Sequence, residues 1–289
     1  MNHLLASLGF IAITTYNAMA IDLTPLWDFS KPELSEQRFR AALETTKGDD
    51  ALILHTQIAR THGLRKDFAK ARAVLAAIEP QMKTAGNEAR ARYALELGRT
   101  YASATHTREM LTDAAKVNAR MAFTEALAVA KSGALDALAI DAIHMFAFID
   151  NAPADQLKWA QEALVVAVAS NQPAARRWEG SIRNNLGMAL HGLSRFGEAL
   201  AQFKQALAIR EQGDDLGRTR VAHWMVAWTL RAMNRVDESL EIQLRLEKEW
   251  AAANEPDPYV FEELEALYRG KGNEERASHY SALRRPAVK

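Results

Sequence analysis

The residue types that most often catalyse reactions or bind metals are scattered along this chain. Eight histidines are present and cysteine is absent, which excludes thiolate nucleophiles, thiolate metal sites and disulfides. His55 and His62 lie seven residues apart, and a metal there would need ligands from another element. A catalytic role would have to use His144 with Asp141 and Arg99. A packed, hydrogen-bonded histidine is the simpler interpretation of His144.

Local motifs of enzymes are also missing. The sequence contains no His-Glu-x-x-His, no glycine-rich phosphate loop, no Gly-x-Ser-x-Gly and no calcium loop. Lys plus Arg and Asp plus Glu each number 36, so a net charge of zero provides no long-range attraction to nucleic acid or to an anionic membrane. We therefore expect a protein that is not an enzyme, that binds no nucleic acid, and that carries no cofactor and no metal.

The first twenty residues have the features of an export signal. The stretch Leu4–Ile13 is almost wholly apolar, and Ala18-Met19-Ala20 offers the small residues that a signal peptidase cleaves after. Export to the periplasm is the favoured interpretation. The alternative is a cytoplasmic protein that starts at Met19. The apolar stretch is shorter than the roughly twenty residues that span a bilayer, so we expect no integral membrane anchor. Residues 21–32 are predicted to form an extended segment.

Helices must position any functional side chains, because the chain is rich in Ala, Leu, Arg and Glu, the strongest helix formers. The clearest pattern runs from Asn185-Leu186-Gly187 through Ala199 and Phe203 to Ala206-Leu207. Spacings of three and four residues place these side chains on one face of each of two helices. We expect Gly187 to let the first helix, helix A, approach its neighbour closely. Phe203 of the second helix, helix B, would fill the space behind it.

The same pattern recurs along the chain at steps of about 36 to 48 residues. The third copy is irregular, because its helix B residues arrive late, and we expect a longer hairpin loop or extended helices between Ala102 and Thr112. The fourth copy has a turn at Asn151-Ala152-Pro153. The small or short residues that open each predicted helix B are Ser35, Ala71, Ala119, Gln156, Ala199, Ser239 and Ala277.

This order of residues resembles the tetratricopeptide repeat, in the longer form of kinesin light chain and of many bacterial repeat proteins. The resemblance covers residues 33–286. His144 and Ala227 stand where the pattern has glycine, which leaves the packing of those copies open. The resemblance implies an all-α fold, a right-handed superhelical solenoid of helical hairpins, whose A helices line a concave groove that holds a protein or peptide partner.

The groove-facing side chains follow from helical periodicity, counted from the Leu-Gly step of each helix A. Apolar residues would form a central floor, and Arg60, Arg99, Asn184 and Arg231 would offer hydrogen-bond donors along the walls. Such a surface suits an extended peptide with a bulky apolar residue and nearby carboxylates. The predicted peptide-binding residues are Arg60, Arg99, Asp141, Met145, Asn184, Met188, His191, Trp224, Trp228 and Arg231.

Structural alternatives stay open for several of these residues. Trp224 and Trp228 would equally serve as core between repeats, since aromatic residues at helical spacing usually fill cores. One of Asn184 and Asn185 is expected to bond within the stack. A regulator whose superhelix tightens around a peptide is the alternative to a scaffold. Exposed Tyr268 and Tyr280 near the C-terminus could pair with another copy.

Overall fold

The computed structural model describes residues 21–284, so the predicted export signal lies outside the described residues. Every regular element in 21–284 is a helix, which confirms the predicted all-α fold. The α-helices are α1 (Pro32–Leu43), α2 (Gly48–Leu64), α3 (Phe68–Ile78), α4 (Asn87–Arg99), α5 (Asp113–Ser132), α6 (Asp136–Phe146), α7 (Pro153–Ala169), α8 (Pro173–Arg176), α9 (Glu179–Gly192), α10 (Phe196–Arg210), α11 (Leu216–Ala232), α12 (Val236–Ala252), α13 (Pro258–Gly270) and α14 (Glu274–Arg284). Three 3-10 helices are η1 (Thr24–Leu26), η2 (Glu79–Lys83) and η3 (Arg108–Met110).

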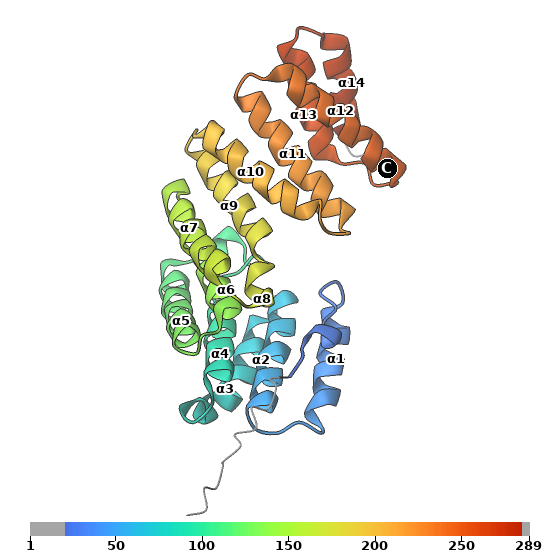
Figure 1. Cartoon of the computed structure of the whole chain (residues 1–289). Helices are drawn as coiled ribbons and strands as arrows, with labels where there is room; N and C mark the ends of the chain where they lie inside the picture. The colour runs from blue at the N-terminus through green and yellow to red at the C-terminus, as the bar shows by residue number, and fades with distance from the viewer. Residues whose placement is uncertain (1–20, 285–289) are drawn as a thin grey trace, which may run out of the picture.

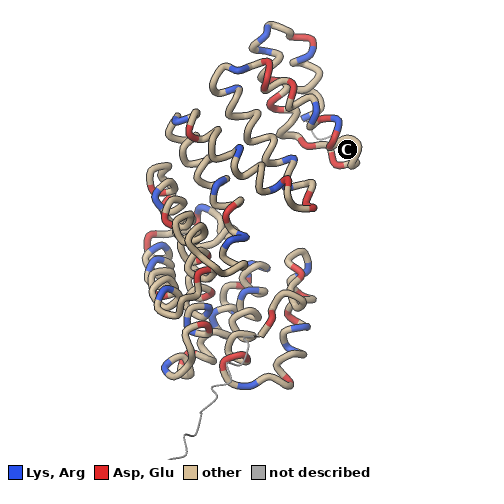
Figure 2. Tube along the Cα trace, in the orientation of Figure 1, with Lys and Arg blue, Asp and Glu red and all other residues tan. Residues whose placement is uncertain are grey.

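Consecutive helices pair into hairpins, and the hairpins stack into a curved array (Figure 1). The A helices are α2, α4, α6, α9, α11 and α13, and each is followed by its helix B. Helix α1 packs on α2 as a lone helix B. The array is a helical repeat solenoid, in which each hairpin buries its apolar stripe against its neighbours. Acidic and basic residues are interspersed along its whole length (Figure 2).

Most A–B hairpins end helix A in the same tight turn. Lys66, Ser194, Asn234 and Gly272 occupy the left-handed region, with φ between 59° and 72°. The residue after each one donates its backbone N–H to a carbonyl five residues earlier, as Arg195 does to Leu190 at 2.9 Å. This is the Schellman arrangement, which satisfies the last carbonyls of a helix. The turn fixes the angle between the two helices of a repeat.

The glycines of helix A make room for a phenylalanine of helix B, as the sequence predicted. A Cβ atom on Gly187 would lie 2.6 Å from the ring of Phe203, and one on Gly98 would lie 2.3 Å from the ring of Phe123. Six of the seven predicted helix B markers are fully buried, which confirms the repeat register. The exception is Gln156, whose amide donates to the carbonyls of Ala147 and Asp150.

The predicted irregularities are confirmed. Residues 100–112 form a long connection between α4 and α5, and the turn before Pro153 separates α6 from α7. Two expectations were wrong. The segment 21–32 is not wholly extended, because it contains η1. Tyr280 is buried and donates to Glu247, so it is not exposed for pairing with another copy.

Candidate functional site

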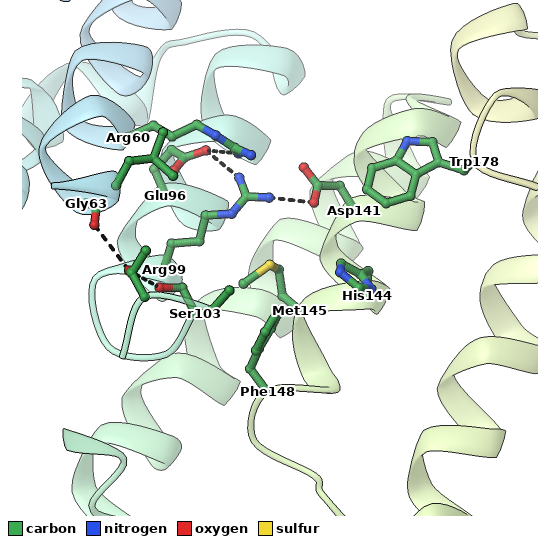
Figure 3. A pocket seen from close by; sticks show the side chains of 13 residues that line it. Arg60, Gly63, Glu96, Arg99, Ser103, Asp141, His144, Met145, Phe148 and Trp178 are labelled. Carbon is green, nitrogen blue, oxygen red and sulfur yellow. Dashed lines mark hydrogen bonds and ion pairs between the residues drawn. The ribbon is translucent and has the colours of Figure 1, made fainter. Parts of the chain in front are cut away.

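Three A helices bring the first predicted groove residues together. Arg60 of α2, Arg99 of α4 and Asp141 of α6 face one cavity of about 240 Å³ (Figure 3). Met145 and Phe148 form part of its apolar wall. The cavity lies where the repeats are irregular, because the long connection after α4 supplies Ser103, Ala104 and Thr105. The remaining lining residues are Gly63, Leu64, Glu96, His144 and Trp178.

Ion pairs link the three helices across the cavity floor. Glu96 accepts from Arg60 at 3.0 Å and from Arg99 at 2.5 Å, both to Oε1. Arg99 donates a further hydrogen bond to Asp141 Oδ1 at 2.5 Å. Two positive and two negative groups therefore form one neutral chain of charges. Carboxylates therefore already engage Arg60 and Arg99, and their predicted role as hydrogen-bond donors to a peptide stays a prediction.

The charged side chains of this network are largely buried, so each depends on its ion-pair partners to stay ionised. Burial alone would lower the pKa of Arg99, but the carboxylates of Asp141 and Glu96 raise it above its ordinary value. Burial also opposes ionisation of Asp141, but Arg99, and next Arg60, hold its pKa below the ordinary value. Both groups are therefore charged at neutral pH. The Nε of Arg60 is buried without a hydrogen-bond partner.

Aromatic rings form the wall toward the next repeat. His144 lies edge-on to Phe148 and 5.8 Å from the ring of Trp178. Burial lowers the pKa of His144, so the imidazole is neutral at pH 7. Its Nδ1 lies 3.5 Å from the amide nitrogen of Asn185. Of the two neighbouring asparagines, Asn185 is thus the one that contacts the stack, and this packed histidine has no partner arranged for proton transfer.

Several lining residues were missed by the sequence prediction, Glu96 and Trp178 among them. Glu96 lies on the face of α4 that also carries Arg92 and Arg99, so the signal in the sequence was the three-residue spacing between Glu96 and predicted Arg99. Trp178 sits just before α9, after the extra short helix α8. Arg176 links α8 to the end of α7, because its Nε donates to the carbonyl of Ser170 at 2.7 Å. Pro173 offered the signal for α8, since proline favours the first turn of a helix.

The inner face of the C-terminal repeats carries a stack of aromatic rings. The ring of His191 stacks on Trp228 at 3.4 Å, and Trp228 stacks on Trp224 at 5.7 Å. The indole of Trp224 donates to the carbonyl of Tyr259 at 3.2 Å. Both tryptophans are half-buried and pack against core residues. Burial, followed by the charge of Arg231, lowers the pKa of His191, so the imidazole of His191 is neutral at pH 7.

The other predicted residues differ in how exposed they are. Met145 is buried, whereas Met188 is 42% exposed and remains accessible on α9. Asn184 lines a shallow hollow of about 570 Å³ between α9 and α11. Arg231 is bound by both oxygens of buried Glu263, at 2.7 and 2.8 Å, so it too is paired rather than a free donor.

The positions of the acidic residues and histidines show whether they could together bind a metal ion. Within residues 21–284, no group of three or more His, Asp or Glu side chains is placed to hold a metal ion. His62 instead lies 3.6 Å from a carboxylate oxygen of Glu36. The helices of the described part also include none that is long and apolar enough to cross a membrane.

Comparison with known protein families finds repeats of one family in part of this array. Residues 166–246 match the family described as "Tetratricopeptide repeat". No curated protein matches the chain. Among solved structures, the crystal structure of BtubC (BKLC) from P. vanneervenii shares 14% sequence identity, with a TM-score of 0.40, over 91% of this chain and 90% of that one. Repeats of the matched family are in general protein–protein interaction modules and are typically not enzymes.

Proposed function

We propose that this tetratricopeptide repeat protein is a scaffold that binds a protein or peptide partner on the inner face of its A helices. The single observation that supports it is the continuous set of inner-face side chains. Charged groups of α2, α4 and α6 are followed by stacked aromatic rings of α9 and α11. A surface of this kind offers apolar area and polar groups to an extended segment.

The same geometry argues against catalysis at this site. The only histidine in the cavity is neutral and packed, and the acidic residues there are held by arginines. A general base needs a side chain within reach of a substrate proton and a pKa matched to its task, and no such pair is arranged here. Within the described part of the chain, we therefore assign the cavity to binding rather than to chemistry.

Exposed residues of the inner face give the clean test. Trp228 and Arg231 are poor choices for mutation, because Trp228 packs on the core and loss of Arg231 would leave Glu263 buried without a partner. Met188 is accessible, and Val165 on α7, 70% exposed, provides a matched site on a helix B. Because the chain has no cysteine, Met188→Cys and Val165→Cys each carry one photo-reactive maleimide.

Cross-linking in an extract of the source organism then locates the binding face. We expect a discrete covalent adduct from position 188 and none of comparable yield from position 165. Addition of unlabelled wild-type protein should compete the adduct away, because it occupies the same partner. Equal adduct formation from both positions, or from 165 alone, would refute use of the inner face.

A further inference from the structure

One A helix lacks the cover that the others have. In each helix A the residue just before the position that Gly98 and Gly187 occupy, and the residue four before that, point under the preceding helix B. At these two positions α2, α6, α9, α11 and α13 carry buried side chains. The equivalent residues of α4, Leu97 and Tyr93, are only half-buried. Among the A helices of residues 21–284, α4 alone has this exposed face.

The preceding helix B covers each of the other faces. Phe39 of α1 packs on Leu54 and Ile58 of α2, and Leu246 of α12 packs on Val260 and Leu264 of α13. Helices α5, α7 and α10 cover α6, α9 and α11 in the same way. An amphipathic helix is thus the element that this fold places on this kind of face.

Helix α3 cannot complete the cover on α4. It has only 11 residues, against 15 to 20 in α5, α7, α10 and α12. Helix α1 is also short, with 12 residues, but Leu26 and Trp27 of the preceding segment complete its cover on α2. Helix α3 ends at Ile78, and η2 follows directly from Glu79, with Pro80, which lacks an N–H group, in its first turn. Tyr93 and Leu97 pack on one side against the cluster of Ala59, Ala71 and Leu75, and their other side is open.

The result is an open groove of about 520 Å³ along α4, which we call the α4 groove. Its floor is Tyr93, Ala94, Leu97 and Tyr101, and its walls include Met82 and Met121, the latter 68% exposed. Charges of both signs stand on the rim, where Arg90 and Glu125 face each other at 3.6 Å. The remaining lining residues are Glu79, Lys83, Asn118 and Ala122.

We propose that the α4 groove binds an amphipathic α-helix of a partner protein, which takes the place of the cover that α3 does not provide. Apolar side chains of that helix, three and four residues apart, would pack on Tyr93, Leu97 and Met121. Flexible methionines suit such contacts, because they adapt to the shape of the incoming residue. The rim is mixed in charge, so the stripe of apolar residues, rather than net charge, decides recognition. This surface is separate from the inner face and does not depend on it.

A synthetic helix provides the probe. A peptide of about 15 residues carries Leu and Ala at helical spacing, with Glu and Lys elsewhere, and a second peptide has the same composition with the stripe scrambled. The full chain carries an environment-sensitive dye on Asn118→Cys, at the groove rim, or on Val165→Cys as the control. We expect saturable binding in the micromolar range at position 118, about tenfold weaker for the scrambled peptide. The response at position 165 should be absent.

A substitution in the floor of the α4 groove shows whether the peptide binds there. Tyr93→Lys should weaken binding by about tenfold, with unchanged circular dichroism, because Tyr93 is only half-buried. Met188→Asp on the inner face should leave peptide binding unchanged, so failure here and failure of the scaffold proposal are distinguishable. Equal binding of both peptides, or no saturation below about 1 mM, would overturn the proposal. Sedimentation that shows a dimer with the position 118 dye buried would assign the groove to a second copy and also overturn it.

Discussion

Arg99→Met gives the most direct test of the ionic network that joins α2, α4 and α6. The side chain of Arg99 is 12% exposed, and those of Glu96 and Asp141 are 3% and 15% exposed. Methionine fills a similar volume but leaves Asp141 buried without its guanidinium partner. Removal of one member of a buried pair typically costs about 3–5 kcal/mol. Glu96 keeps Arg60, so we expect a loss of about 3 kcal/mol in unfolding free energy at pH 7.

Urea denaturation followed by tryptophan fluorescence measures this loss, with the slope of the transition compared between variants to detect any change in cooperativity. The matched control is Arg195→Met, which removes an equally well-formed bidentate pair with Glu198 on the surface. Arg195 and Glu198 are 44% and 60% exposed. An exposed pair contributes about 0.2–1 kcal/mol, so the control should barely change the midpoint.

The pH dependence has a definite sign. In the wild type, Asp141 has a lowered pKa, so its contribution to stability is present above the unfolded value of 3.8 and is lost as the pH falls through the folded value. In Arg99→Met, burial without Arg99 raises the pKa of Asp141, and protonation relieves the unpaired charge. The deficit of the variant should therefore shrink between pH 7 and about pH 5.

Two results would refute this reasoning. One is an equal cost for Arg99→Met and Arg195→Met, which would mean that the inner network is solvated as well as the surface pair. The other is a deficit that stays constant with pH. The double variant Arg99→Met with Asp141→Leu removes the orphaned carboxylate, and we expect it to recover most of the lost stability.

Three further predictions concern packing, turns and protonation. Gly187→Ala should cost about 1–3 kcal/mol in unfolding free energy because its Cβ would overlap Phe203, whereas Gly197→Ala, which meets no atom within 4 Å, should be neutral or stabilising by up to about 1 kcal/mol. Ala134→Gly should raise the melting temperature, because Ala134 has φ of 50° and an L-residue there costs about 1–2 kcal/mol. Proton NMR titration should place the His144 midpoint below 6.5, since burial favours the neutral ring, and stability should fall as the pH drops through the unfolded value.

The repeat architecture could be predicted from the sequence because its determinants are local. Gly187, Ala199 and Phe203 are close along the chain, and each recurs at the same place in a hairpin, so helical spacing alone places them at one contact. The stripe that contains Arg60, Arg99 and Asp141 followed from the same periodicity.

Tertiary structure decided how those side chains are used. Arg60 meets Glu96 and Arg99 meets Asp141 across 36 and 42 residues, and the choice of partner depends on the displacement of each repeat relative to the next. The same holds for the exposed face of α4. Its exposure depends on where the short helix α3 ends relative to α4, which begins nine residues later. Sequence periodicity fixes which face a residue occupies. Whether that face is covered, paired or open is set by packing between repeats, which no single hairpin encodes.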